Sequence, residues 1–111
     1  MVALFSYGTL QQREVQLATF GRELVGTPET LSGHRLTSLA ITDANVVKVS
    51  GKAVHTIAVP TGDPDDRVEG TLFELTQAEL DSSDRYEVDA YARVEVKLDS
   101  GRRAWAYLGS P

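Results

Sequence analysis

The chain has 111 residues, of which 41% are hydrophobic and 24% charged, and it contains no cysteine. This length and composition are typical of one compact domain, and the lack of cysteine excludes disulfides, thiolate nucleophiles and cysteine-bound zinc. The 16 acidic residues outnumber the 11 basic ones, whereas nucleic-acid-binding proteins gather basic residues on one face. No apolar run reaches the roughly 18 residues that a membrane span needs, and no signal-peptide pattern is present. We therefore expect a cytoplasmic protein with no nucleic-acid partner and no membrane association.

The first half of the chain consists of short apolar runs separated by turn-forming residues. Such runs predict strands where glycine, asparagine or aspartate bounds them. The predicted strands cover residues 2–7, 24–31 and 35–41, with a hairpin over residues 46–59. Residues 11–20 carry apolar side chains at helical spacing and are followed by Gly21, which predicts a short helix ended by a glycine cap.

The second half begins with a loop over residues 60–66, which is rich in proline, glycine and aspartate. The predicted strands after it cover residues 67–75, 91–98 and 103–107. Thr76 and Glu79 have the spacing of a capping box, in which each side chain bonds the backbone N–H of the other, so we predict a helix over residues 77–83. Many short strands with two short helices indicate an α+β fold, a small mixed β-barrel flanked by short helices, formed by residues 1–111 as one domain.

The stretch "LFSYGTL" leads a strand directly into a glycine. Gly8 lies between the first predicted strand and the first predicted helix, where a glycine can take a positive φ and leaves its N–H accessible. The amides of Thr9, Leu10 and Gln11 then stand at a helix N-terminus, which suits a carboxylate or an oxyanion. The alternative is a tight strand-to-helix turn in which Thr9 caps the helix.

A second candidate is Glu87, which follows the second predicted helix in "DRYEVDAY". A carboxylate between Tyr86 and Tyr91 can have its pKa raised by apolar surroundings and can then serve as a proton shuttle. The alternative is a solvated surface glutamate near Arg85. Composition alone does not identify the working acid, because the same region also contains Asp81, Asp84 and Asp89.

The last two predicted strands carry further candidates. Tyr91 and Arg93 share a face by period-two parity, and Arg93 is placed to pair with Glu87 or with a substrate carboxylate. The alternative is that this face simply points to solvent. Trp105 and Tyr107 alternate with alanines, and we interpret them first as side chains that fill a barrel.

Several common catalytic and metal-binding patterns are missing from the sequence. It has no G-x-S-x-G elbow, no Walker loop and no G-x-G-x-x-G. Neither His34 nor His55 has a partner at metal-ligand spacing, so we expect structural or surface roles for both.

Four blocks of the sequence, taken in order, resemble the γ-glutamyl cyclotransferase-like family. They are "LFSYGTL", "RVEGTLFEL", "DRYEVDAYARVEV" and "GRRAWAYL". In that family a strand with Tyr-Gly-Thr-Leu precedes a Val-x-Gly-x-Leu-aromatic-x-Leu strand, and Asp-x-aromatic-Glu, Tyr-x-Arg and a tyrosine-bearing last strand follow. The resemblance spans nearly the whole chain, whose short length is similar to that of the compact γ-glutamylamine cyclotransferase type.

This resemblance implies a small mixed β-barrel with a catalytic glutamate and a substrate-binding loop. Glu87 is the implied general acid and base. The implied substrate-binding residues are Tyr7, Gly8, Thr9, Leu10, Tyr91, Arg93 and Tyr107. In the implied reaction, the α-amine of a γ-glutamyl amine or peptide attacks its own side-chain carbonyl. The reaction releases 5-oxoproline and an amine or amino acid, and it requires no metal and no cofactor.

Two other functions remain open at this point. The same pocket can be a non-catalytic binding module that holds a small carboxylate ligand. The domain can also be a scaffold without a usable cavity. A cavity in which Glu87 faces the amides of the Gly8 turn distinguishes the scaffold from the other two. The sequence indicates no oligomeric state.

Overall fold

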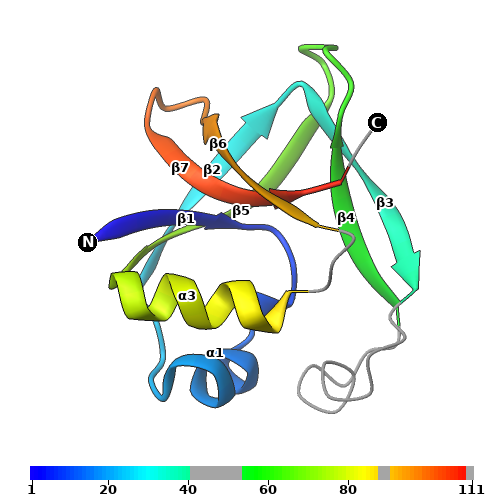
Figure 1. The fold of residues 1–111 in the computed structure, drawn as a ribbon. Helices are drawn as coiled ribbons and strands as arrows, with labels where there is room; N and C mark the ends of the chain where they lie inside the picture. The colour runs from blue at the N-terminus through cyan, green and yellow to red at the C-terminus, as the bar shows by residue number, and fades with distance from the viewer. Residues whose placement is uncertain (41–53, 88–90, 110–111) are drawn as a thin grey trace.

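A computed structural model describes residues 1–40, 54–87 and 91–109 of the chain (Figure 1). Its elements in chain order are β1 (Val2–Ser6), the 3₁₀ helix η1 (Thr9–Gln11), α1 (Arg13–Phe20), β2 (Gly26–Ser32), β3 (His34–Ala40), β4 (Val54–Pro60), β5 (Arg67–Leu75), α3 (Gln77–Tyr86), β6 (Ala92–Lys97) and β7 (Arg103–Leu108). Each predicted strand and helix that falls within these residues is present. The first arm of the predicted hairpin over residues 46–59 lies outside the described residues.

The helix boundaries show where local sequence decides the structure. The predicted capping box is confirmed, because the Glu79 N–H donates to Thr76 Oγ1 at 3.1 Å and the Thr76 N–H donates to Glu79 Oε1 at 2.9 Å. This helix continues to Tyr86, three residues beyond the predicted end. The first helix begins at Arg13 rather than at residue 11, because η1 occupies the preceding turn, and it ends at Gly21 with φ 73°, as the glycine cap predicts.

The strands form one mixed seven-stranded sheet in the order β2-β5-β1-β7-β4-β3, and β6 pairs with β7 outside this path. β1 and β4 run parallel to β7, and the other pairs are antiparallel. The predicted α+β class is confirmed, but the predicted barrel does not close. β2 and β3 stand at opposite ends of the strand order although Gly33 alone separates them in sequence.

The two ends of the sheet meet at one corner around Gly33. The Gly33 N–H donates to the Asp66 carbonyl at 2.8 Å, and the Gly33 carbonyl accepts from the Thr61 N–H at 2.8 Å. These bonds join the β2–β3 turn to the β4–β5 loop. Elsewhere β2 and β3 pair with β5 and β4 and not with each other, so the sheet curls without becoming a barrel.

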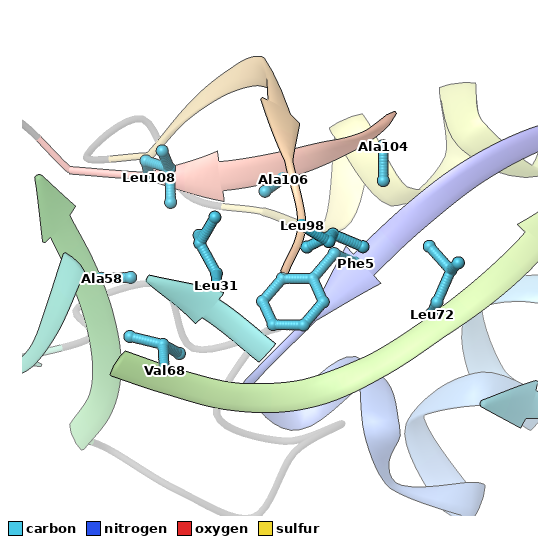
Figure 2. Packing of buried hydrophobic residues seen from close by; sticks show 9 residues of the cluster. All are labelled: Phe5, Leu31, Ala58, Val68, Leu72, Leu98, Ala104, Ala106 and Leu108. Carbon is cyan, nitrogen blue, oxygen red and sulfur yellow. The ribbon is translucent and has the colours of Figure 1, made fainter. Parts of the chain in front are cut away.

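The sheet has an inner hydrophobic face and a face covered by helices, as the alternation along β7 shows. Ala104, Ala106 and Leu108 belong to the inner cluster, where Figure 2 shows them with Phe5 of β1. Trp105 and Tyr107 point the other way, into a second cluster beneath the helices. The interpretation of these two aromatic residues as barrel filling was therefore wrong. The inner face of a tightly curled sheet is narrow, and alanines occupy it on β7.

The helices α1 and α3 lie beside one another on one side of the sheet (Figure 1). Val15 of α1 and Leu80 of α3 are buried in the second cluster. The buried Gln16 donates from Nε2 to the Leu10 carbonyl at 2.9 Å and accepts the Leu24 N–H at 2.8 Å, so its amide joins three segments. Among the helices that the structure describes, none is long and apolar enough to cross a membrane.

The close approach of β1 to β5 explains why the β5 motif "RVEGTLFEL" contains a glycine at position 70. β5 pairs with β1 in a register that places Ser6 opposite Thr71. A Cβ atom on Gly70 would overlap the Ser6 carbonyl oxygen and lie 2.9 Å from the Phe5 ring. The backbone of β1 therefore approaches β5 closely at the end from which Tyr7 and Gly8 emerge.

We expect Gly70→Ala to lower the free energy of unfolding by about 1–3 kcal/mol, because the backbone of β1 must move to make room for the methyl group. Urea unfolding monitored by circular dichroism measures this change. Gly8→Ala is the matched control, since Gly8 has φ −120° and a Cβ there meets nothing within 4 Å. Equal stability of the two variants would contradict the steric role of Gly70.

Candidate functional site

The site begins at a split in the sheet beside β7. β6 pairs along the whole of β7, so β1 and β4 share its other edge, β1 pairing at Trp105 and β4 at Leu108. Tyr7 follows β1 at this split. Its hydroxyl accepts the Ala58 N–H of β4 at 2.9 Å and donates to the Tyr107 carbonyl of β7. One phenol thus joins two strands where β1 leaves the sheet.

The Gly8 turn differs from the prediction in its backbone. Gly8 has φ −120° rather than a positive φ, and it is the residue that caps η1. Thr9 does not cap α1 either, because its Oγ1 lies 2.6 Å from the Tyr86 hydroxyl. Within the described part of the chain, the N–H groups of Gly8, Thr9 and Leu10 donate to no backbone carbonyl, as expected for the first amides of a helical turn. Gln11 N–H donates to the Gly8 carbonyl at 3.1 Å.

A cavity of about 330 Å³ lies beside this turn. Six of the residues predicted for the site line it, namely Tyr7, Gly8, Thr9, Glu87, Tyr91 and Tyr107. Two predicted residues do not. The Leu10 side chain is buried in the second cluster, and Arg93 lies outside the lining. Residues from both ends of the sequence therefore meet at one cavity.

Glu87 supplies the carboxylate of the cavity. It directly follows α3, and its N–H donates to the Ser83 carbonyl at 3.0 Å. Its half-buried side chain forms no hydrogen bond and no ion pair with any described residue. The proposed pairing with Arg85 is absent, since Arg85 donates to Ser82 Oγ instead. Burial, with a smaller effect of the Asp84 charge, raises the pKa of Glu87 to about 8.

Tyrosines surround this carboxylate. Tyr91 donates from its hydroxyl to the Thr56 carbonyl at 2.8 Å, and Tyr107 donates to Asp84 Oδ1 at 2.5 Å. Burial raises the pKa of Tyr7, Tyr91 and Tyr107, and the charge of Glu87 raises all three further. These phenols therefore stay neutral near pH 7 and provide a polar lining without charge.

Arg93 pairs with Asp84 and not with Glu87. Its Nε lies 2.9 Å from Asp84 Oδ1, and its guanidinium carbon lies 4.5 Å from the centre of the Trp105 ring. The same Asp84 carboxylate accepts the Tyr107 hydroxyl, whose oxygen also lies 2.7 Å from Ser83 Oγ. Arg93 thus belongs to a polar network behind the cavity.

Four lining residues were not among the candidates from the sequence, namely Phe5, Ser6, Gln12 and Thr56, whereas Gln11, whose amide was a candidate, does line the cavity. Gln12 lies two positions after the Tyr-Gly-Thr-Leu segment, so extending that segment would have found it. Gln11 is held in place, because its Oε1 accepts the Thr71 hydroxyl at 2.8 Å. The Gln12 side chain has no hydrogen-bond partner among the described residues, which leaves its amide available to a ligand. Thr56 carries no local signal.

The described residues contain no group of three or more histidine, aspartate or glutamate side chains arranged to hold a metal ion. His34 Nδ1 lies 3.0 Å from the Ser32 carbonyl, in keeping with its predicted structural role. The side chain of His55, like Asp89, lies outside the described part of the structure.

We expect Tyr7→Phe to reduce the free energy of unfolding by about 1–3 kcal/mol, because the Ala58 N–H and the Tyr107 carbonyl lose a shared partner in a buried position. Thermal unfolding measures the loss. Tyr91→Phe serves as the control, since it removes one bond to a carbonyl of the exposed Thr56. An equal or larger loss in Tyr91→Phe would show that the Tyr7 bridge is not the stronger constraint.

The raised pKa of Glu87 predicts a pH-dependent stability. Between its ordinary pKa of 4.5 and its folded pKa of about 8, the folded protein binds a proton that the unfolded chain does not. Stability from this group is therefore complete below pH 4.5 and is lost as pH rises through 8. Glu87→Gln should be more stable than the original protein by more than about 1 kcal/mol at pH 9, with the difference vanishing near pH 4.

Urea unfolding at pH 4, 7 and 9 tests this expectation. Glu95→Gln is the control, because the Glu95 side chain is 52% exposed on β6. A difference between Glu87→Gln and the original protein that does not grow with pH would show that Glu87 ionises freely in solvent.

Several solved structures share the fold of this chain. The structure is similar to one described as γ-glutamyl cyclotransferase, with TM-score 0.73, 18% identity and coverage of 97% of this chain and 66% of that one. It is also similar to an uncharacterised human protein, loc79017, with TM-score 0.74, 19% identity and coverage of 99% and 67%. A third similar structure is that of an uncharacterised protein of Pyrococcus horikoshii, with TM-score 0.63, 16% identity and coverage of 98% of this chain and 78% of that one.

The TM-scores show a common fold, and the chain spans about two thirds of the length of the first two structures. No curated protein matches the chain in sequence. The family model described as "Gamma-glutamyl cyclotransferase, AIG2-like" matches residues 4–111, which is nearly the whole chain. The chain therefore belongs to the γ-glutamyl cyclotransferase, AIG2-like family.

Proposed function

We propose that the protein is a γ-glutamyl cyclotransferase in which Glu87 is the general acid and base. The observation that carries this proposal is an unpaired carboxyl group in the cavity that also contains the Gly8 turn. A half-buried carboxyl group without a partner costs stability, and its raised pKa is the property that a proton-transferring group needs near neutral pH. Family membership supports the same class of reaction.

The cavity suits a small substrate with both charged and apolar parts. Its volume of about 330 Å³ lies at the lower end of ligand-binding pockets, which span roughly 300–1,000 Å³. In the proposed complex, the amides of Gly8, Thr9 and Leu10 bind the carboxylate or the carbonyl oxygen of the γ-glutamyl group. The free amide of Gln12 offers a further donor and acceptor.

In the proposed first step, the Glu87 carboxylate takes a proton from the α-ammonium group of the substrate. The nitrogen lone pair then attacks the side-chain carbonyl carbon and forms the new C–N bond of a five-membered ring. Because nucleophile and carbonyl belong to one molecule, the enzyme has to select the reactive conformation and need not bring two molecules together. Backbone amides stabilise the negative charge on the carbonyl oxygen without rearrangement.

In the second step, Glu87 donates its proton to the departing nitrogen as the original C–N bond breaks. The ring nitrogen loses its second proton to the released amine, so the charge of the ammonium substrate ends on the ammonium product. The ring product is 5-oxoproline. One carboxyl group with a pKa of about 8 can both accept and donate the proton at neutral pH.

We expect Glu87→Gln to lower the rate of 5-oxoproline release by at least about 10²-fold, because the glutamine amide cannot carry the proton. The assay uses a panel of γ-glutamyl amines and γ-glutamyl dipeptides, with 5-oxoproline measured by chromatography. Ligand binding, measured as a rise in melting temperature with substrate, should persist in this variant.

Glu95→Gln is the matched control and should retain the original rate, since Glu95 lies on β6, pairs with Arg103 and does not line the cavity. A Glu87→Gln variant with full activity would refute the assigned role. If no member of the panel is converted although substrates still raise the melting temperature, the protein is a binding module rather than an enzyme.

A further inference from the structure

We propose that the Asp84–Arg93 ion pair is a positioning element that controls the protonation of Glu87, and that Arg93 acts through Asp84 instead of on the substrate. Its catalytic meaning rests on the proposed function, because it requires Glu87 to be the acid and base. The electrostatic part of the inference concerns the folded protein alone and is testable without substrate.

The geometry fixes the position of the Asp84 charge. Asp84 lies one helical turn before Glu87, so the two side chains leave neighbouring positions at the end of α3. Its Oδ1 accepts the Tyr107 hydroxyl at 2.5 Å and lies 2.9 Å from Arg93 Nε. Tyr107 lines the cavity, which connects this network directly to the wall beside Glu87.

Arg93 is fixed from two sides and is therefore not free to follow a ligand. Its guanidinium group stacks on Trp105 at 4.5 Å and pairs with Asp84, and its side chain is 27% exposed. It projects from β6, whose register places Arg93 directly opposite Tyr107. This pairing brings the cation to the carboxylate that accepts the Tyr107 hydroxyl.

The groups that face Glu87 come from several elements. Asp84 on α3 raises its pKa by charge repulsion. The phenols of Tyr7, Tyr91 and Tyr107 are neutral, and the Tyr86 ring lies on the same helix as Asp84. Among the described lining residues there is no lysine, arginine or histidine. Asp84 lies outside the lining, and its charge acts on Glu87 from behind the cavity, where Arg93 partly neutralises it.

Opposite effects of the two partners follow from this arrangement. Removing the Asp84 charge relieves the repulsion, so Glu87 should ionise at lower pH. Removing the Arg93 charge leaves Asp84 unneutralised, so Glu87 should ionise at higher pH. A merely structural ion pair predicts no such opposition, because loss of either partner would loosen the same contact.

The experiment titrates the side-chain carboxyl of Glu87 by carbon-13 NMR, with Glu87→Gln used to assign the signal. We expect Asp84→Asn to lower the midpoint by at least about half a pH unit and Arg93→Met to raise it. Arg93→Lys, which keeps the charge, should remain closer to the original midpoint than Arg93→Met. The double variant Asp84→Asn with Arg93→Met should have a midpoint between those of the two single variants, because the opposite effects of the two charges add.

The matched control is Arg103→Met, because Arg103 forms the ion pair of the same hairpin with Glu95 at 3.4 Å and is 73% exposed. The inference would be overturned if Asp84→Asn and Arg93→Met moved the titration midpoint of Glu87 in the same direction. It would also be overturned if neither variant moved this midpoint further than Arg103→Met does. Opposite shifts without any 5-oxoproline release would uphold the electrostatic role while refuting the proposed function. With activity present, the pH dependence of kcat/KM should move with the NMR midpoints.

Discussion

The hydroxyl group of Tyr7 is the constraint on which the site depends. β1 and β4 both pair with the same edge of β7. Where β1 leaves this edge and β4 has not yet joined it, backbone N–H and carbonyl groups need other partners. Tyr7 fills that position by accepting from Ala58 and donating to Tyr107. The bridge directs the chain away from the sheet, so the following turn lies at a cavity rather than in a ladder.

The same region contains a conflict between stability and chemistry. Glu87 ends a well-capped helix, but its carboxyl group lies among neutral phenols and has no partner in the described structure. The buried Ser83 on the same helix is bonded by contrast, because its Oγ donates to the Leu80 carbonyl at 2.7 Å. A half-buried carboxyl group without a partner is the pattern expected where function overrides local stability.

Local sequence predicted those features that depend on neighbouring residues. The capping box of Thr76 and Glu79, the glycine cap at Gly21 and the strand over residues 67–75 are each determined within a few positions. The curl of the sheet was not predictable in this way, because it depends on Gly33 contacting Asp66 and on the pairing of distant strands. Whether the sheet closes into a barrel depends on the order in which all strands pair, and no local sequence pattern predicts that order.

The candidate site shows the same difference between features that neighbouring residues determine and features that distant strands determine. Glu87, Tyr7 and Gly8 line the same cavity, as their motif and their chemistry led us to expect. Arg93 was assigned to the substrate because its parity with Tyr91 is visible in the sequence, whereas its pairing with Asp84 depends on how β6 meets α3. The direction of Trp105 and Tyr107 depends on which face of β7 meets the helices, and alternation alone leaves that choice open.

The pairing of β1 with β7 also determines when the cavity can appear during synthesis. Leu4 pairs with Trp105, and Tyr7 bonds a residue 100 positions later in the chain. A ribosome-bound chain therefore carries the Gly8 turn through the synthesis of the next hundred or so residues without the strand that holds it in place. The pocket can assemble only after β7 has emerged.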